Sequence, residues 1–282
     1  MGYNESRYLT IPDTLLMQPM VNIALRAARQ ASEQITRALE RLDLIKSEQD
    51  SVATFLTDTC RNVERSIAFN IQKANPHHSI FGDYSGEYAA QEEGPTPCEW
   101  RVHCIDNVVH FSNGIPSFAI CLTGTVRGKI EHALVLNPIT GEEFTASNGQ
   151  GAQLNGKRLR VSNHKTLENT VIGTGFLARP ADAKHLDLQL NITRAIIESG
   201  ASTFSTGSVA LNLAYTAAGR LDGIVQQGVT SDDVDAGLLI LREAGGLSGD
   251  FNGGTNVRGT GELIAANPKL FKALMTKVHA VK

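Results

Sequence analysis

The chain has 282 residues, of which 41% are hydrophobic and 20% charged. That is enough for a full core in one large domain or two closely packed subdomains. Its 26 Lys and Arg against 29 Asp and Glu leave a formal net charge of −3, which gives no reason to expect direct nucleic-acid binding, because phosphate backbones require clustered cations. The chain contains no apolar run near the roughly 20 residues of a membrane span and no start typical of a secretion signal.

The beginning of the chain is predicted to be a tail followed by a long helix. Pro12 and Pro19 interrupt any periodicity, so we expect residues 1–18 to lie outside the folded unit. Apolar residues then recur at helical spacing over 21–42, which predicts an amphipathic helix.

A second helix and a loop are expected next. Thr57 or Asp58 is the predicted N-cap of the helix, and Pro76 is its predicted end. Residues 82–99 are rich in Gly, Glu and Pro, which predicts a loop.

The middle of the chain is β-rich. Turn dipeptides separate its apolar runs, and Asn-Gly pairs supply the positive φ that tight hairpin turns require. The predicted strands are 117–126, 129–136, 142–147 and 153–161, with turns at Arg127-Gly128, Asn148-Gly149 and Asn155-Gly156.

Strands and helices alternate in the last part of the chain. The predicted strands are 170–176, 221–225 and 263–266, and the predicted helices are 186–199, 208–218, 234–244 and a last one opened by Asn267-Pro268. Asp232 or Asp233 is the expected cap of the third of these helices. Alternation without a clear linker predicts an α/β or α+β fold with layers around large sheets.

Three acidic residues stand at predicted element boundaries. Asp83 follows an apolar pair, Asp106 follows the segment 100–105, and Asp233 opens a helix. Carboxylates at such places converge easily and bind hard cations through oxygen. The alternative is structural, with Asp233 as a helix cap and the other two as solvated loop residues, and residue pattern alone favours that alternative.

Histidine and cysteine suggest a weaker metal hypothesis. His103 is either a metal ligand or acid–base group, or a half-buried strand residue bonded to the backbone. Cys98 and Cys104 lie near it in sequence, but the absence of a second Cys/His pair at suitable spacing disfavours zinc. The four cysteines show no paired layout, which predicts a reduced, cytoplasmic protein.

Several stretches carry a resemblance to a known family. They are 20–29, 142–147 leading into 151–156, 213–220 and 243–246. On these stretches the chain resembles the inositol monophosphatase superfamily, most closely its bacterial SuhB-type branch, from about Met17 to the C-terminus.

The resemblance implies a layered α-β-α-β-α architecture. It places one folded unit at 19–282, with an N-terminal α+β subdomain at 19–165 and a C-terminal α/β subdomain at 166–282. It also implies a homodimer and hydrolysis of phosphate monoesters with two or three Mg²⁺ ions. The metal positions would be Asp83, His103, Ile105, Asp106 and Asp233, and the substrate or phosphate positions would be Asn107, Val108 and Gln226.

Many of these positions depart from the family pattern. The central motif of the family is Trp-x-x-Asp-Pro-x-Asp-Gly-Thr, and this chain keeps its Trp and second Asp but has His103, Asn107 and Val108 where the family has Asp, Gly and Thr. The resemblance implies that this Asp bridges two metal ions, that the Gly holds the phosphate and that the Thr hydroxyl helps to orient the attacking water. Cys60 replaces an Asp of the second helix, and Gln226 replaces a substrate-side Glu. The Trp-Asp-x-Ala-Ala-Gly motif reads Asp232-Asp233-Val234-Asp235-Ala236-Gly237.

These departures lead to two hypotheses. The first is an inactive pseudo-phosphatase with a regulatory or scaffolding role, whose partner the resemblance suggests among transcription antitermination proteins. The second is a phosphomonoesterase acting on inositol or sugar phosphates with a rebuilt site, in which the aspartates and His103 hold Mg²⁺, Mn²⁺ or Zn²⁺, and His103, Asp106 or His110 serves catalysis. A third, smaller possibility is a sensor that binds a small molecule without turnover.

Overall fold

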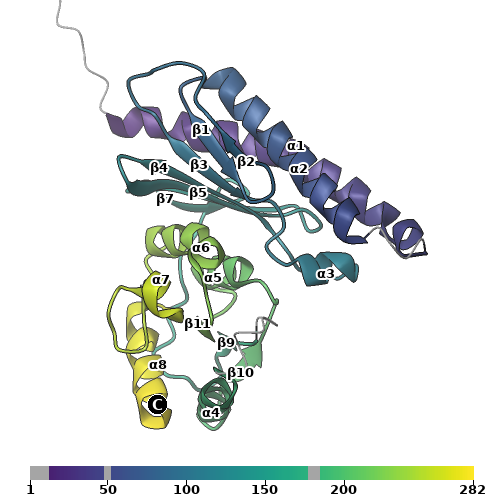
Figure 1. The fold of residues 1–282 in the computed structure, drawn as a ribbon. Coiled ribbons are helices and arrows are strands. Elements are labelled where there is room, and N and C mark those ends of the chain that lie inside the picture. The colour runs from purple at the N-terminus through teal and green to yellow at the C-terminus, as the bar shows by residue number, and fades with distance from the viewer. Residues whose placement is uncertain (1–12, 48–51, 177–184) are drawn as a thin grey trace, which may run out of the picture.

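The computed structural model describes residues 13–47, 52–176 and 185–282, which form five stacked layers in the order helix, sheet, helix, sheet, helix (Figure 1). Two buried clusters lie on opposite faces of the first sheet, and a third lies beyond the second sheet. The layered α/β architecture expected from the sequence is confirmed. No helix in the described part of the chain is both long and apolar enough to cross a membrane.

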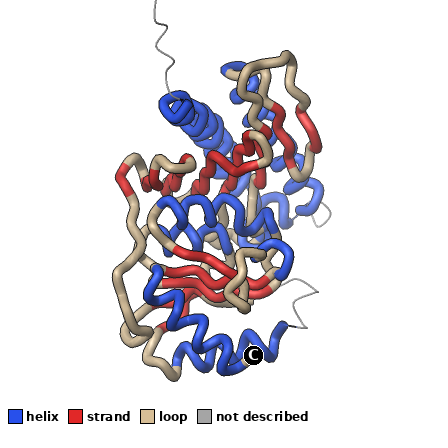
Figure 2. Tube along the Cα trace, turned by 90° about the vertical axis from the view of Figure 1, so that its left-hand side faces the viewer, coloured by secondary structure: helices blue, strands red, loops and turns tan. Residues whose placement is uncertain are grey.

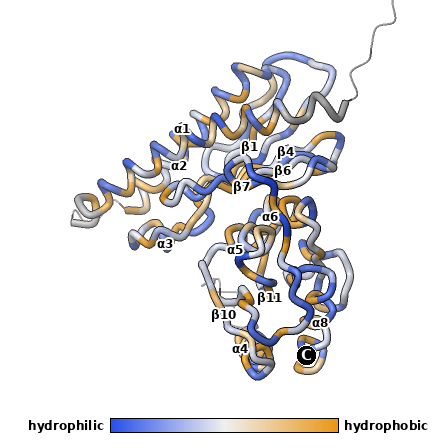
Figure 3. The backbone as a smooth tube through the Cα atoms, turned by 180° about the vertical axis from the view of Figure 1, so that it is seen from behind, coloured by the Kyte–Doolittle hydropathy of each residue, from blue (hydrophilic) through white to orange (hydrophobic). Residues whose placement is uncertain are grey.

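The first layer consists of two helices, α1 (Asp13–Ser47) and α2 (Val52–Ala74). Residues 13–18 belong to α1 and not to the predicted tail. The predicted cap of α2 is also wrong, because the helix begins at Val52, before Thr57, whose hydroxyl donates to the carbonyl four residues earlier at 2.9 Å. Hydrophobic and hydrophilic residues alternate along both helices, as expected where one face covers a sheet (Figure 3).

The second layer is an eight-stranded sheet in the order β2-β1-β3-β4-β5-β6-β7-β8. Its strands are antiparallel except for the parallel pair β1 and β3. The predicted loop at 82–99 in fact contains the last residue of β1, all of β2 and the first residue of β3. The bounds are β1 Ser79–Gly82, β2 Gly86–Tyr88, β3 Glu99–His103, β4 Ile120–Val126, β5 Lys129–Asn137, β6 Glu142–Ser147, β7 Gly151–Leu154 and β8 Lys157–Arg158.

The hairpin turns of this sheet follow from local backbone preference. Both residues of Arg127-Gly128 and both of Asn155-Gly156 have positive φ, as a two-residue primed turn requires. At Asn148-Gly149 only the glycine does, at φ 74°, because three residues and not two connect β6 to β7. The first two predictions are confirmed, and the third is right in place but wrong in turn type.

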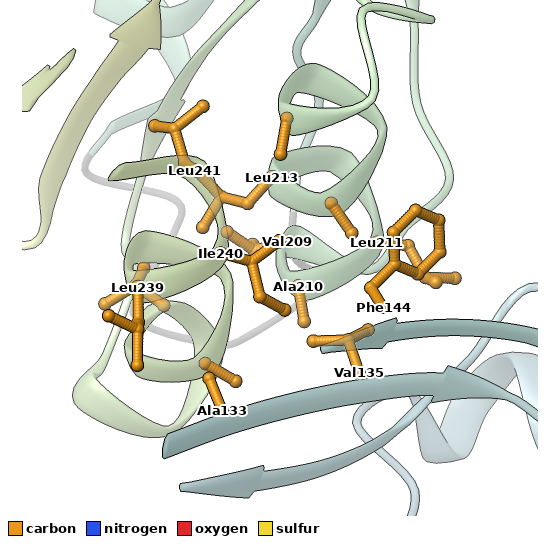
Figure 4. Close-up of a cluster of buried hydrophobic side chains, with 14 of the residues drawn as sticks. Ala133, Val135, Phe144, Val209, Ala210, Leu211, Leu213, Leu239, Ile240 and Leu241 are labelled. Atoms are coloured by element: carbon orange, nitrogen blue, oxygen red, sulfur yellow. The ribbon is translucent and has the colours of Figure 1, made fainter. Parts of the chain in front are cut away.

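The third layer, helices α5 (Val209–Ala217) and α6 (Ser231–Glu243), lies between the two sheets. Along β5, Ala133 and Val135 point toward these helices, whereas Leu134 and Leu136 pack toward α1 and α2. Figure 4 shows Ala133, Val135 and Phe144 facing apolar side chains of both helices. A strand buried on both faces therefore joins the first three layers.

The fourth layer is a five-stranded sheet in the order β10-β9-β11-β13-β12, and α4 and α8 form the fifth (Figure 2). Asn267 caps α8 through the backbone N–H groups of Lys269 and Leu270, and Pro268 opens the helix, as predicted. The remaining bounds are β9 Val171–Gly173, α4 Leu186–Ile197, β10 Ser202–Phe204, β11 Gly223–Gln227, β12 Leu247–Gly249, β13 Glu262–Ala266 and α8 Pro268–Val281, with short helices α3 Val108–Ser112 and α7 Val257–Thr260.

Candidate functional site

Four of the five residues implied at metal positions meet where the first sheet faces the start of α6. Asp83 follows β1, His103 ends β3, and Asp106 precedes α3. Asp233 lies in the first turn of α6. Electrostatic coupling links His103 to Asp83 and Asp106, and Asp106 to Asp233. The fold thus brings these four side chains into one polar centre, which we call the aspartate centre.

His103 forms a close side-chain contact with Asp83 through its Nδ1 atom. Burial by itself lowers the pKa of His103, but the contact with Asp83 and the charges of the surrounding aspartates outweigh burial, so the pKa of the imidazole is raised. The Nδ1 atom is engaged with Asp83, so the histidine is an internal partner of that carboxylate.

Both carboxylate oxygens of Asp106 accept hydrogen bonds from the protein. The backbone N–H of Ala119 donates to Oδ1 at 2.7 Å, and the hydroxyl of Ser208 donates to Oδ2. Burial raises the pKa of Asp106, whereas the bond from Ser208 and the charge of His103 lower it, and burial prevails. Asp106 joins the segment after β3 to the N-cap of α5, since Ser208 also accepts from the N–H of Leu211.

Asp233 takes part in capping α6, though not as the N-cap residue of the structural alternative. Its Oδ2 accepts from the N–H of Thr230 at 2.7 Å and from the Thr230 hydroxyl at 2.8 Å. The N-cap of α6 is thus Thr230, in a capping box with Asp233 at the third helical position. The prediction that Asp232 or Asp233 is itself the N-cap residue is wrong.

The other family-equivalent positions serve the fold. Asn107 caps α3 by accepting from the N–H of His110, and its amide donates to the carbonyl of Gly207 at 2.8 Å. Val108 is the first residue of α3, and Ile105 is buried in the core under α1 and α2. Gln226 lies in β11 of the other sheet, where its amide donates to the carbonyl of Gly175 at 2.8 Å.

The acidic and thiol side chains behind the centre are also bound internally. Glu64 is fully buried and accepts from the N–H groups of Tyr84 and Ser85, while burial raises its pKa. Cys60, at the position of the missing Asp, is buried beside Cys104. Burial and the Cys60 thiol raise the pKa of Cys104, which makes it a poor source of a metal-binding thiolate.

This donor set does not fit a pair of Mg²⁺ ions. Magnesium requires several oxygen ligands in near-octahedral array, but Asp83, Asp106 and Asp233 already accept from protein donors, and the bridging position is an imidazole. Among the residues that the structure describes, no three His, Cys, Asp or Glu side chains are grouped so as to hold a metal ion. The zinc hypothesis has no support in the placement of Cys98 either, which lies near the indole of Trp100 close to Gly124.

Arg101, Asp232 and Ser208 belong to this centre and were not found from the sequence. Arg101 Nε lies 2.8 Å from Asp232 Oδ1, and its Nη2 lies 3.7 Å from Asp83 Oδ1. The available signal was the spacing of Arg101 two residues before His103, which places both on one face of a strand. Ser208 gave no such signal, because it precedes a helix and looks like any N-cap serine.

Comparison with known proteins agrees with this architecture. The model of the inositol monophosphatase family matches residues 16–282. Nus factor SuhB of Pseudomonas aeruginosa is 42% identical to the chain over 263 residues, which cover 93% of this chain and 97% of that protein. Nus factor SuhB of Escherichia coli K12 is 38% identical over 264 residues, with the same coverage.

Solved structures give the same result. The extragenic suppressor protein suhB from Bartonella henselae superposes with a TM-score of 0.79 at 30% identity, covering 92% of this chain and 98% of that one. The Thermotoga maritima IMPase superposes with a TM-score of 0.75 at 27% identity, covering 92% and 96%. This chain therefore belongs to the inositol monophosphatase family and, within it, to the SuhB type.

Proposed function

We propose that this chain is a catalytically inactive member of its family that works through protein contacts, in a regulatory or scaffolding role. The observation that carries the proposal is His103 at the metal-bridging position, bonded to Asp83. An imidazole in place of that carboxylate cannot bridge two hard cations, because such cations select oxygen ligands.

The expected decrease in the rate of phosphate ester hydrolysis supports the proposal of an inactive protein. A two-metal phosphatase clamps the attacking and leaving oxygens with both ions. Removing one preorganised catalytic donor typically lowers the rate by about 10²–10³. His103, Asn107 and Val108 together remove a bridging ligand, a phosphate-binding glycine and a water-orienting hydroxyl. Effects of residues that act as a unit are not additive, but all three act in the same direction.

The proposed partner is a protein of transcription antitermination. Relatives at 38–42% identity over nearly the whole chain bear the name Nus factor SuhB. The net charge of −3 suits protein contacts better than direct nucleic-acid contact. We further propose that the chain forms a homodimer, as the family resemblance suggests.

Hydrolysis assays test the loss of activity. Purified protein is mixed with p-nitrophenyl phosphate or inositol monophosphate and with Mg²⁺, Mn²⁺ or Zn²⁺ in turn, and phosphate release is measured. We expect the rate to match that of Asp106→Asn, which keeps the shape of the side chain but removes its charge. Metal-dependent turnover that Asp106→Asn abolishes would overturn the proposal.

A reversion experiment shows whether the departures themselves silence the site. The triple variant His103→Asp, Asn107→Gly and Val108→Thr restores the family residues at the three positions. A gain of metal-dependent hydrolysis would show that these positions account for the loss. No gain would assign the loss to other departures, with Cys60→Asp as the next change to add.

An active metal-dependent phosphomonoesterase is the second candidate. The observation in its favour is that three carboxylates remain, with Asp83 one methylene shorter than the family's Glu: Asp83 and Asp106 lie near His103, and Asp233 lies near Asp106. In that case Mn²⁺ or Zn²⁺ would suit the imidazole better than Mg²⁺, and His103 or His110 would act as general acid or base. The same hydrolysis assay separates the candidates, since only this one gives turnover with wild-type protein.

The partner proposal has its own measurement. Light scattering after size-exclusion chromatography gives the mass of the free protein, which we expect to be that of a dimer. Titration with purified antitermination factors of the same organism then tests binding directly. We expect the triple reversion variant to bind like wild type, because the scaffolding role is independent of the aspartate centre.

A further inference from the structure

Arg101 crosses from the first sheet to the start of α6. It lies beside Phe81 of the parallel strand β1, with its guanidinium carbon 4.9 Å above the centroid of that ring. From there its Nε reaches Asp232 Oδ1 at 2.8 Å, and its Nη2 lies 3.7 Å from Asp83 Oδ1. One fixed positive charge thus lies between carboxylates from two layers.

The start of α6 carries more negative charge than the family motif supplies. Asp232 and Asp235 stand where that motif has Trp and Ala, on either side of Asp233. Each added carboxylate is paired with an arginine, because Arg258 Nε donates to Asp235 Oδ1 at 2.6 Å while Arg101 binds Asp232. Each of these two carboxylates is therefore neutralised by an arginine from another segment of the chain.

A guanidinium is well suited to this place. It stays charged at any pH at which the protein folds, and its planar donors stack on an aromatic ring while they bind carboxylates. A divalent ion approaching Asp83 from this side would meet a positive charge already bound there. Close like charges repel strongly where the surroundings are only partly hydrated.

We propose that Arg101 is the resident cation of the aspartate centre, taking over the charge neutralisation between β1, β3 and α6 that divalent ions supply in metal-dependent members of the family. This rests on the proposed absence of a bound metal pair. Arg101 is accordingly a positioning residue, and it makes the centre insensitive to divalent cations.

Thermal unfolding with and without metal tests the proposal. Arg101→Met keeps an unbranched side chain of similar length and removes the charge, so the carboxylates lose their counter-ion. We expect the melting temperature of this variant to rise by about 2–4 °C when MgCl₂ or MnCl₂ is added at roughly ten times its dissociation constant, with ionic strength held constant by NaCl. Wild type should change by less than about 1 °C under the same conditions.

Arg258→Met is the matched control. Arg258 is also about half exposed, with 54% of its side chain accessible against 49% for Arg101, and it also pairs with a carboxylate of α6. It should show no metal-dependent rise, and Arg101→Lys, which restores the charge, should show none either. An equal response of Arg101→Met and Arg258→Met would overturn the proposal, as would a wild-type response equal to that of Arg101→Met.

A second variant covers the case in which Arg101→Met does not fold. Arg101→Met with Asp232→Asn removes one charge of each sign, so we expect it to fold and to respond to metal less than Arg101→Met does. If Arg101→Met is unfolded in metal-free buffer, refolding in Mg²⁺ supports the proposal, and failure to refold both in Mg²⁺ and in the double variant contradicts it. Wild-type phosphatase activity would overturn the proposed function but is a different result from any of these.

Discussion

The α5–α6 layer and the aspartate centre share a helix but differ in what their residues do. The layer buries apolar side chains against both sheets, and in β5 and β13 successive residues alternate between two cores. The centre, at the start of the same α6, consists of charged groups that bind one another. The first region keeps the apolar pattern that the fold requires, whereas the second departs from the family pattern at His103, Asn107 and Val108. The residues that build the core are therefore separate from those at which the site departs from the family.

The largest expected effect on stability concerns the packing of the first sheet against the α5–α6 layer. Phe144 of β6 is fully buried, with its ring centroid 5.9 Å from that of Tyr215. Phe144→Ala should lower the free energy of unfolding by about 3–5 kcal/mol, because it removes a packed ring and leaves a cavity. Urea unfolding followed by circular dichroism measures the loss.

Phe69 provides the matched control for this prediction. It lies on α2 and is 64% exposed, so Phe69→Ala should cost less than about 1 kcal/mol. Similar losses for the two variants would mean that the α5–α6 layer is not the dominant core.

The next largest expected effect is a loss of stability at low pH. The Trp100 indole N–H donates to His78 Nδ1 at 3.1 Å and its ring stacks on His132, with centroids 5.8 Å apart. Both histidines are fully buried, and the Nε2 of each has no hydrogen-bond partner within the described part of the chain. Burial is the main reason why the pKa of each histidine is lowered to about 4.

The sign of the pH effect follows from these values. The unfolded chain has histidine pKa values near 6.5 and binds the protons first, so stability is full above about pH 6.5 and is lost as pH falls toward 4. The loss is at most about 3 kcal/mol per histidine. Urea unfolding at several pH values can be followed by fluorescence of Trp100, the one tryptophan in the sequence.

Removing one buried histidine should remove its part of the pH dependence. We expect His132→Gln to flatten the loss of stability between pH 6.5 and 4, whereas His164→Gln, at a site with 46% of the side chain exposed, should leave it unchanged. An identical pH profile in all three proteins would rule out the buried histidines as its source.

The same contrast explains how far the sequence predicts the structure. The layers were predictable because strands buried on both faces, such as β5 and β13, read as short continuous apolar runs, and because α8 has buried apolar residues at helical spacing. The strand β2 and the early start of α2 were missed, because three-residue strands and helix starts without a strong cap leave little local signal. In a sequence, a short strand flanked by Gly and Glu residues has the same residue pattern as a loop.

The candidate site was predictable only in position. The frame from Trp100 to Asp106 located the centre, because its residues are close in sequence. The Arg101–Asp232 and Asp106–Ser208 pairs were not predictable, since each joins segments far apart in the chain without any shared periodicity. The capping box at Thr230 was missed because Asp232 and Asp233 are stronger cap formers by residue type.

The smallest expected effects test whether the aspartates of the centre are structural. Asp233→Ala removes the acceptor for two donors of Thr230 and should cost about 1–2 kcal/mol of unfolding free energy. Asp106→Asn should cost less than about 1 kcal/mol, because the amide oxygen still accepts from Ala119 and the amide nitrogen can donate to Ser208. Both losses, measured by urea unfolding, should be the same with EDTA or with Mg²⁺. A loss that appears only with Mg²⁺ would show instead that these carboxylates hold a metal.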